Sequence, residues 1–470
     1  MFRHSPWNEY GNSRPSRGGN LSRIKAMSTD LMPNRFTPGE ATIPPRESEL
    51  IARRDSVLGA SYRLQYRRPV HFVRGEGIWL YDPDGRRYLD FYNNVPSLGH
   101  CNPEINAAMA EQASRISANT RYLEPRLVDY AERLVATFPE ELNRVVFTCT
   151  GSESNDLALR IARLTSGSEG VIVSSHAYHG TSAATAMASP NLGDAIKLSP
   201  AVRMVSLHGP AGVPDRQAAE FFEEQVRSAI ADLNRRGIGV AALLIDSIFS
   251  SDGVWVDPPG FIAGGVKAVQ EAGGLVIADE VQPGFGRTGT HMWGFERHEV
   301  VPDLVTLGKP MGNGFPIGAV VGRKAPMDRF GATARYSNTF GGNTVGIAAA
   351  DAVLTILHRD RIPEHALAMS ERLRVGLEHL AKLHPGIRGV RNAGLFFGVD
   401  IGLDGAGEAS RRAMALDIVN LMRDDGVLIS TTGANEDTLK VRPPLICQAE
   451  HVDRFLEAME SALKKAVAQV

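Results

Sequence analysis

Residues 275–289 read LVIADEVQPGFGRTG and hold the pattern that decides the fold. Their first residues are apolar without interruption, and an acid and a glycine-rich turn follow. A short run of this kind is typical of a strand that is covered on both faces of a sheet. Similar runs occupy residues 145–147, 171–173, 242–245 and 304–307. Helical stretches at residues 216–235 and 261–272 lie between them, which predicts an α/β fold with a largely parallel sheet flanked by helices.

The pattern changes near residue 345, where helices outnumber strands. Helical periodicity covers residues 347–357, 365–383, 413–424 and 451–466, and a strand is predicted at 394–401. Near the other end of the chain, aromatic runs flank the turn Asp82-Pro83-Asp84-Gly85, which predicts a hairpin. Residues 1–45 hold several prolines and no sustained periodicity. The expected organisation is an unstructured arm (1–45), a segment whose hairpin joins the small domain (46–95), a large domain (96–344) and a smaller α+β domain (345–470).

Charge and composition exclude several classes of protein. The 470 residues include 51 Lys and Arg against 53 Asp and Glu, so there is no basic excess to bind nucleic acid. No apolar run approaches the roughly 20 residues that cross a bilayer. The 3 cysteines are far apart, which fits neither a disulfide framework nor a metal site. His100, His179 and His298 lack metal-ligand spacing, so we expect structural histidines, no metal and a cytoplasmic protein.

Polar residues that follow buried strands are the first candidates for a site, because ligands of open α/β sheets bind beyond the carboxyl ends of the strands. After the strand at 145–147 comes Thr150-Gly151-Ser152-Glu153, which leads into a helix predicted from residue 156 to 164. Backbone N–H groups at a helix start, together with Gly151 and the Ser152 hydroxyl, form a cradle for a phosphate. The alternative is a capping box, since Thr150 and Glu153 have its spacing.

An acid and a lysine follow two further strands. Asp279 ends the run at 275–278, where a buried carboxylate calls for a bound positive group or for a salt bridge to a neighbouring arginine. Lys309 ends the run at 304–307 inside a Gly and Pro loop. A lysine held there has the low pKa and the nucleophilic amine that a Schiff base requires, whereas the alternative is an ordinary surface lysine.

Residues 284–289 match GxGxxG, which would indicate a dinucleotide site if a helix followed. The next residues contain Gly294 and run into Pro302, so a nicotinamide site is not favoured. A phosphate cradle, an acid and a lysine at the strand ends of one sheet instead match the phosphate, ring nitrogen and aldehyde of pyridoxal 5'-phosphate.

The span from Ile277 to Gly289, followed by Gly308-Lys309, is similar to the signature of the class III aminotransferases, the ornithine and 4-aminobutyrate type of PLP fold type I. The resemblance covers roughly residues 50–468. It implies that Lys309 carries the cofactor as a Schiff base and that Asp279 pairs with the ring nitrogen. The remaining cofactor contacts that it implies are Val281 on the ring face, Gln282 near the ring hydroxyl, Gly151 and Ser152 at the phosphate, and Tyr178 stacked on the ring.

The same resemblance assigns two residues to other partners. Thr339, within Asn338-Thr339-Phe340-Gly341-Gly342, matches a threonine that reaches the cofactor phosphate of the neighbouring subunit. Arg442, before Pro443-Pro444, matches an arginine that grips the substrate carboxylate, for which its bidentate fork is suited. The resemblance therefore implies a homodimer with shared sites, acting on small amines and 2-oxo acids.

One departure from the family bears on the reaction. Many members have a glutamate thought to switch between two substrates, and this chain has Asp246-Ser247-Ile248 there. Other segments, such as Asn93-Asn94-Val95 and Gly99-His100-Cys101, look most like the branch with alanine-glyoxylate aminotransferase 2 and ethanolamine-phosphate phospho-lyase. The first hypothesis is thus an aminotransferase, and the alternative is a lyase that acts on an amino-alcohol phosphate or an aminophosphonate. A non-catalytic protein that binds the cofactor is the third.

Overall fold

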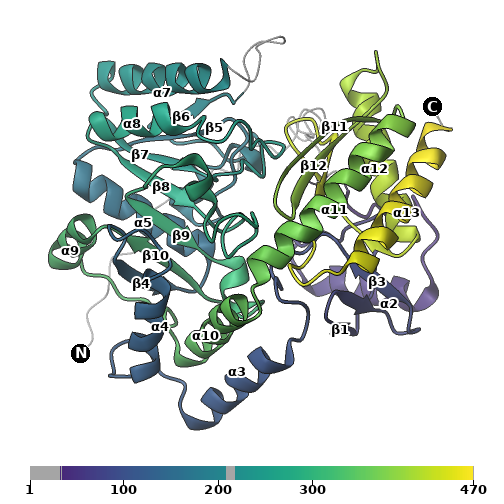
Figure 1. Ribbon diagram of the computed structural model, residues 1–470, viewed down its shortest axis with the longest axis horizontal. Coiled ribbons are helices and arrows are strands. Elements are labelled where there is room, and N and C mark those ends of the chain that lie inside the picture. The colour runs from purple at the N-terminus through teal and green to yellow at the C-terminus, as the bar shows by residue number, and fades with distance from the viewer. Residues whose placement is uncertain (1–31, 33, 208–216, 469–470) are drawn as a thin grey trace, which may run out of the picture.

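The computed structural model describes residues 32, 34–207 and 217–468, which form two lobes (Figure 1). The larger lobe of this described part is built on a 7-stranded sheet of order β4-β10-β9-β8-β7-β5-β6. Strands β9, β8, β7, β5 and β6 pair in parallel, and β10 runs antiparallel to both of its neighbours. The strands are β4 (Arg144–Thr148), β5 (Gly170–Ser174), β6 (Val202–Val205), β7 (Val240–Ile245), β8 (Leu275–Asp279), β9 (Leu304–Leu307) and β10 (Gly318–Gly322).

Helices cover both faces of this sheet, and the continuous apolar strands reflect it. One face packs against α5 (Gly151–Ser166) and α9 (Lys324–Thr333) through an apolar cluster that includes Leu159 and Phe330. The other face packs against α7 (Ala218–Arg235) and α8 (Ala263–Glu271) through a cluster that includes Phe222 and Val269. The remaining helices of this lobe are α3 (Pro103–Arg115), α4 (Pro125–Val135), α6 (Ala183–Ala186) and α10 (Thr344–Arg359).

The second lobe combines two smaller sheets with long helices. One sheet has the order β11-β12-β15-β14, and the other joins the N-terminal hairpin to a C-terminal strand in the order β1-β2-β3-β13. The strands are β1 (Arg74–Glu76), β2 (Trp79–Tyr81), β3 (Arg87–Asp90), β11 (Ile387–Ala393), β12 (Phe396–Ile401), β13 (Val427–Leu428), β14 (Ser430–Thr432) and β15 (Thr438–Val441). The helices are α11 (Ile362–Leu383), α12 (Glu408–Asp424) and α13 (Ala449–Val467).

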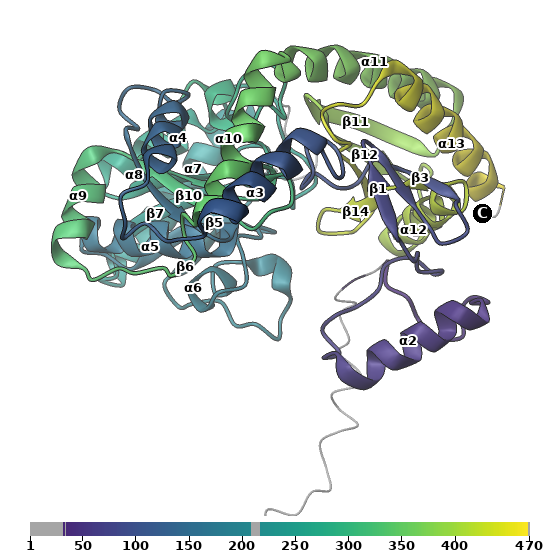
Figure 2. The same cartoon turned by 90° about the horizontal axis from the view of Figure 1, so that it is seen from below.

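The N-terminal arm that was predicted for residues 1–45 lies outside the described residues up to residue 31 and at residue 33. Contrary to that prediction, residues 34–36 are attached to the rest of the chain. The backbone oxygen of Asn34 accepts a hydrogen bond from the N–H of Tyr66 (2.7 Å), and its side-chain oxygen accepts one from Asn420 (3.1 Å). Helix α2 (Pro45–Val57) then stands away from both lobes (Figure 2) and has no buried residue.

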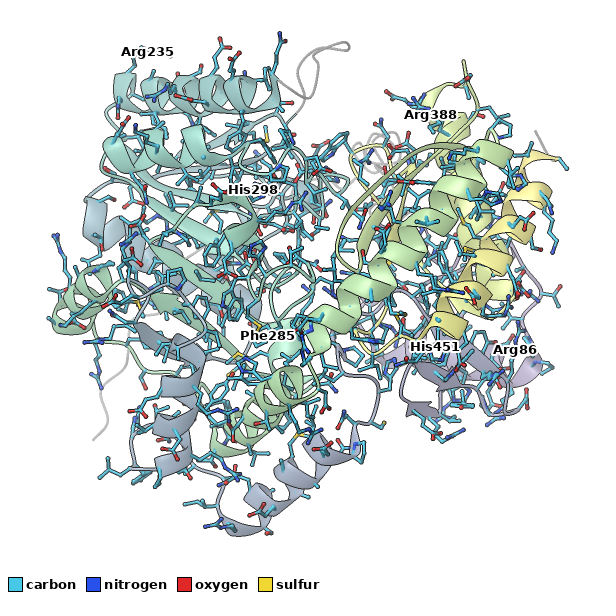
Figure 3. All side chains as sticks on the ribbon, viewed as in Figure 1. Arg86, Arg235, Phe285, His298, Arg388 and His451 are labelled. Atoms are coloured by element: carbon cyan, nitrogen blue, oxygen red, sulfur yellow. The ribbon has the colours of Figure 1, made fainter. Side chains whose placement is uncertain are left out.

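The predicted strands lie where the sequence placed them. β6 and β10 of the large sheet were missed, as were β11, β13, β14 and β15 of the small lobe, and α5 begins at Gly151 and not near residue 156. The GxGxxG match does not open a helix. It forms turns with positive φ at Phe285 (60°) and Gly286 (76°), and the short 3-10 helix η3 (Gly294–His298) follows. Phe285 is buried against Trp293, with ring centroids 5.0 Å apart, where the two lobes meet (Figure 3).

The described helices include none with the length and apolar character that a bilayer crossing requires.

Candidate functional site

The carboxyl ends of β4, β5, β7, β8 and β9 open on one pocket of about 100 Å³. It brings together every predicted site residue of the sequence analysis except Thr339 and Arg442, and it adds four residues that were not assigned a role in the site. The pocket is lined by Gly151, Ser152, Asn155, Tyr178, His179, Gly180, Asp246, Asp279, Val281, Gln282 and Lys309.

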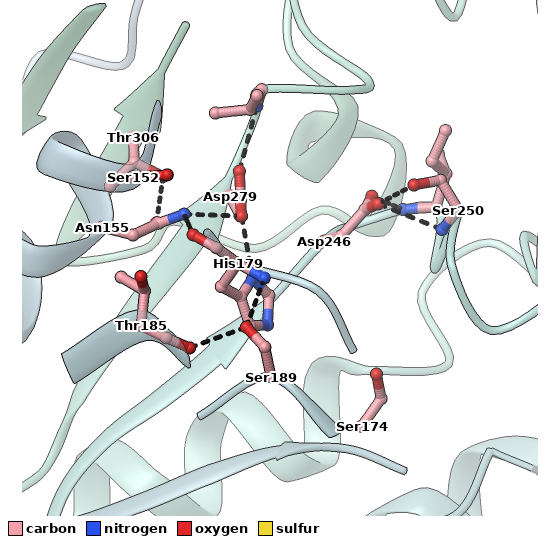
Figure 4. Close-up of polar contacts among 12 residues, drawn as sticks. Ser152, Asn155, Ser174, His179, Thr185, Ser189, Asp246, Ser250, Asp279 and Thr306 are labelled. Atoms are coloured by element: carbon pink, nitrogen blue, oxygen red, sulfur yellow. Dashed lines mark hydrogen bonds and ion pairs between the residues drawn. The ribbon is translucent and has the colours of Figure 1, made fainter. Parts of the chain in front are cut away.

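Asp279 is buried and held by two side chains (Figure 4). Its Oδ2 accepts hydrogen bonds from Asn155 Nδ2 and His179 Nδ1, both at 2.8 Å. Its Oδ1 accepts one from the backbone N–H of Val281 at 3.2 Å. The arginine that the salt-bridge alternative required is absent from the ion pairs of the described residues, and His179 takes its place. The carboxylate is therefore fixed in direction at the end of β8, as a partner for a protonated ring nitrogen must be.

Asn155 and His179 can fix Asp279 in place because other groups fix their own positions. Thr306 Oγ1 donates to Asn155 Oδ1 (2.6 Å), and Asn155 Nδ2 also donates to the backbone oxygen of His179 (2.9 Å). His179 was expected to be a structural histidine, and its side chain is indeed buried and bonded, but its partner is the acid of the site. Its Nε2 is buried and has no hydrogen-bond partner among the described residues. Sequence patterns missed Asn155 and His179, although His179 directly follows Tyr178.

The start of α5 has a side-chain cap, but not the reciprocal bond of a capping box. Thr150 Oγ1 accepts from the N–H of Glu153 (3.1 Å), whereas Glu153 accepts from the N–H of Cys149 (2.8 Å), the residue before the N-cap Thr150. The same turn presents Gly151 and Ser152 to the pocket. A Cβ added to Gly151 would lie 2.8 Å from Val281 Cγ2, so a side chain cannot be accommodated there.

The residues present fit pyridoxal 5'-phosphate. The positive end of α5, with a glycine and a serine hydroxyl, suits its phosphate. Asp279 suits its ring nitrogen, and the amine of Lys309 reaches the same pocket. Val281, 7% exposed, packs between the start of α5 and the turn that carries Lys309, so its apolar branches line the pocket.

Lys309 begins the 3-10 helix η4 (Lys309–Gly312) directly after Gly308, with a positive φ of 23°. Side chains other than glycine rarely adopt such a backbone, and this strain is typical of a functional position. Burial lowers the pKa of the Lys309 amine to about 8, and the positive charge of Arg442 adds to this effect. A larger fraction of the amine is therefore unprotonated near neutral pH than in an exposed lysine.

We expect the rate at which the apoprotein combines with added pyridoxal 5'-phosphate to follow this pKa. Only the unprotonated amine reacts, so the rate rises about tenfold per pH unit below pH 8 and levels off above it. Absorbance on rapid mixing measures the rate. A profile that keeps rising to pH 10 would contradict a lowered pKa. In Arg442→Gln, which removes one cause of the shift, the plateau should move to higher pH.

Arg442 follows β15 and is buried, with 7% of its surface exposed. Its Nη1 donates to Gln282 Oε1 (2.6 Å) and its Nε donates to the backbone oxygen of Tyr92 (2.7 Å). Asn94 Nδ2 donates to the same Gln282 oxygen (2.6 Å). Arg442 thus touches the pocket through Gln282, and it forms no ion pair with a carboxylate of the described residues.

Asp246 lines the pocket but turns its carboxylate to its own loop (Figure 4). Its Oδ1 accepts from the N–H of Ile248 (3.0 Å), and its Oδ2 accepts from the N–H and the hydroxyl of Ser250 (3.0 and 2.5 Å). Burial raises the pKa of Asp246, with a contribution from the charge of Asp279. The shorter side chain at this position therefore caps a turn and does not reach Arg442.

Thr339 does not reach the pocket of its own chain, and its side chain is exposed to solvent. It lies between Asn338 and Phe340, at a second, larger pocket of about 720 Å³ that Asn338 and Gly341 line.

Comparisons with known proteins identify the family. The family model "Aminotransferase class-III" matches residues 62–463. The chain is 36% identical over 430 residues to "Alanine--glyoxylate aminotransferase 2-like" of Drosophila melanogaster, a match that covers 89% of this chain and 87% of that protein. It is 33% identical over 439 residues to "Ethanolamine-phosphate phospho-lyase homolog 1" of Caenorhabditis elegans, covering 89% and 93%.

Among solved structures, a phospholyase from Arthrobacter in complex with phosphoethanolamine is 42% identical, with a TM-score of 0.84, and the match covers 88% of this chain and 99% of that one. The family match, the two relatives and this structure agree with the geometry of the pocket. The chain therefore belongs to the class III aminotransferase family of enzymes, and its cofactor is pyridoxal 5'-phosphate.

Proposed function

We propose that this enzyme is a phospho-lyase that eliminates phosphate from a short amino-alcohol phosphate without using a 2-oxo acid. The observation that carries the proposal is the pairing of Arg442. Its guanidinium binds a neutral amide oxygen and a backbone oxygen, and no carboxylate of the described residues lies within ion-pair distance. Nearby acids act on Arg442 only from a distance, and its guanidinium has no direct carboxylate partner in the described part of the chain.

This pairing bears on the choice of reaction. An aminotransferase binds two different substrates in turn, and in many members of the family a glutamate is thought to help switch between them. Here both carboxylate oxygens of Asp246 accept hydrogen bonds from Ile248 and Ser250. A site whose arginine is always available to an anion suits a single anionic substrate. The 42% identity to a phospholyase, higher than that to the two relatives above, supports the same reaction.

The residues of the pocket supply the steps of an elimination. Pyridoxal 5'-phosphate, which Lys309, Asp279 and the start of α5 would hold, would supply an electron sink for the carbon beside the substrate amine. Lys309, with its lowered pKa, accepts the proton from the carbon that bears the nitrogen. Asp279 keeps a proton on the ring nitrogen, and Arg442 binds the anionic end of the substrate. Overall, phosphoethanolamine and water give acetaldehyde, ammonia and inorganic phosphate.

Amino-group transfer to a 2-oxo acid is the second candidate, and it was the first hypothesis from the sequence. The same Arg442 fork fits a carboxylate, and the Drosophila relative is named after an aminotransferase. In that reaction Lys309 would hold and pass on the same proton, no phosphate would be released, and a 2-oxo acid would be needed to accept the amino group.

One incubation separates the two candidates. Purified holoenzyme is mixed with O-phosphoethanolamine in the absence of any 2-oxo acid, and inorganic phosphate is measured over time. The proposal expects a linear release that far exceeds the enzyme present. Parallel samples contain alanine or 4-aminobutyrate with pyruvate, glyoxylate or 2-oxoglutarate. Amine transfer in those samples, without phosphate release in the first, would favour the aminotransferase instead.

We also propose a homodimer with shared sites, as is typical of the family. Tyr122, Leu123 and Phe340 have 69%, 102% and 70% of their surfaces exposed, and they lie in the segments that line the large pocket beside Thr339. Exposed apolar side chains that gather in this way are typical of a protein interface. A cytoplasmic location stays a prediction.

A further inference from the structure

Lys440 is a buried cation that the proposed mechanism has not used. It lies in β15, where side chains alternate between the two faces of the sheet. Leu439 and Val441 are fully buried in the apolar core of the small lobe. Lys440 and Arg442 therefore share the opposite face, the one from which Arg442 reaches Gln282 in the pocket.

Lys440 has only 8% of its surface exposed. No hydrogen bond or ion pair of its ammonium is found among residues 34–207 and 217–468, and Nζ lies 5.7 Å from the centroid of the Phe396 ring. Nζ is not one of the fully buried atoms without a partner, so the stem of Lys440 is buried while its ammonium stays accessible to a small ligand. On the same small sheet, the cation of Arg391 is paired with a carboxylate, since its guanidinium donates to Asp400 at 2.7 Å. The unpaired ammonium is therefore not explained by the packing of the lobe.

Two cations and two carboxylates act on Lys440. Arg442 and Lys309 act on it as like charges, whereas Asp246 and Glu436 oppose them from neighbouring segments. The Asp246 carboxylate accepts hydrogen bonds from its own loop, and Glu436 Oε2 accepts a hydrogen bond from Thr431 (2.6 Å). Burial and Arg442 lower the pKa of Lys440 well below its usual value. An anion between Lys440 and Arg442 would relieve this repulsion.

We propose that Lys440 and Arg442 together bind the phosphate group of the substrate, and that Lys440 makes the site select a phosphate over a carboxylate. This inference rests on the proposed function and deepens it. A carboxylate carries one negative charge, which the fork of Arg442 alone can satisfy. A phosphate ester carries nearly two near neutral pH and offers three acceptor oxygens, which suit a second cation.

The test replaces Lys440 with methionine, which keeps the apolar stem and removes the charge. We expect the KM for O-phosphoethanolamine to rise by about 10- to 100-fold while kcat changes little, because one charge-assisted hydrogen bond to the substrate is lost. Lys464→Met is the matched control, since Lys464 is an exposed lysine of α13 that pairs with Glu460. Lys440→Arg should recover part of the lost affinity.

A binding measurement keeps the inference testable if no turnover is found. Inorganic phosphate is titrated into the wild-type, Lys440→Met and Lys464→Met holoenzymes by calorimetry, with acetate as the monoanion. Phosphate binding weakened about tenfold or more in Lys440→Met alone, with acetate binding unchanged, supports the inference. Equal phosphate affinity in all three proteins, or no phosphate binding by the wild type, overturns it. Failure of the proposed function is a separate result, namely a wild-type enzyme that releases no phosphate from the ester.

The stability of Lys440→Met separates a role in binding from a role in folding. Removing an unpaired charge from a largely buried side chain should leave the thermal midpoint unchanged or raise it. A midpoint that falls well below that of Lys464→Met would show that Lys440 supports the fold, and this too would overturn the inference.

Discussion

Replacement of Lys309 with alanine is expected to reduce turnover by at least about 1,000-fold, because the same amine attaches the cofactor and moves the proton. Lys309 lies in the pocket at the end of β9, and burial lowers its pKa to about 8. The described residues place no second lysine in the lining of that pocket. The variant should still fold, since the side chain makes no hydrogen bond to the described residues that a folded state would need.

Two measurements check this prediction. Steady-state phosphate release gives the loss in kcat, and borohydride reduction followed by peptide mapping shows which lysine holds the cofactor. Lys324→Ala is the control, because Lys324 is exposed on α9 and pairs only with Asp328. A label on any residue other than Lys309, or a Lys309→Ala variant with normal turnover, would contradict the assignment. Turnover in the wild type that Lys309→Ala loses also excludes the non-catalytic alternative.

Asp279→Asn is expected to lower kcat by about 100- to 10,000-fold while the cofactor stays bound. The amide keeps the shape of the carboxylate but carries no charge to keep a proton on the ring nitrogen. Its new N–H₂ group would also face the donors Asn155 Nδ2 and His179 Nδ1, which now lie 2.8 Å from Asp279 Oδ2. The cofactor is still attached through Lys309 and the start of α5, so KM should change far less than kcat.

The relative changes in kcat and KM, together with the cofactor content, show why Asp279→Asn is slow. Cofactor content is measured by absorbance, and kcat and KM are measured by phosphate release. Asp453→Asn is the control, because Asp453 is an exposed acid that pairs with Arg372. If Asp279→Asn lost its cofactor altogether, or kept a normal kcat, Asp279 would not be the partner of the ring nitrogen.

The fold was largely predictable because the strands of a covered parallel sheet are apolar throughout. The two strands of the large sheet that were missed show where this rule fails. β6 lies at the sheet edge, so Arg203 and the half-exposed Met204 interrupt its apolar run. β10 begins and ends with glycine, which is typical of loops, but Cβ atoms at Gly318 and Gly322 would lie 2.7 and 2.5 Å from neighbouring side chains. Only the packed sheet shows why glycine is needed there.

The candidate site was predicted where a residue follows a strand and its chemistry is distinctive, as for Asp279 and Lys309. Asn155 and His179 could not be assigned, because an amide and an imidazole acquire a role only through the acid that they face, and that acid lies more than 90 positions away in the sequence. Lys440 was overlooked for a similar reason. Strand alternation places it on the face of Arg442, but only the structure shows that its side chain is 8% exposed and forms no ion pair with the described residues.

The central claim is that the enzyme completes its reaction with one anionic substrate. The most direct test counts products when holoenzyme and O-phosphoethanolamine are mixed without a 2-oxo acid, and phosphate, ammonia and the absorbance of the cofactor are followed together. A phospho-lyase should release equal amounts of phosphate and ammonia over many turnovers, with the cofactor still in its aldehyde form at the end. Conversion of the cofactor to its aminated form after one turnover, with no phosphate released, would contradict it.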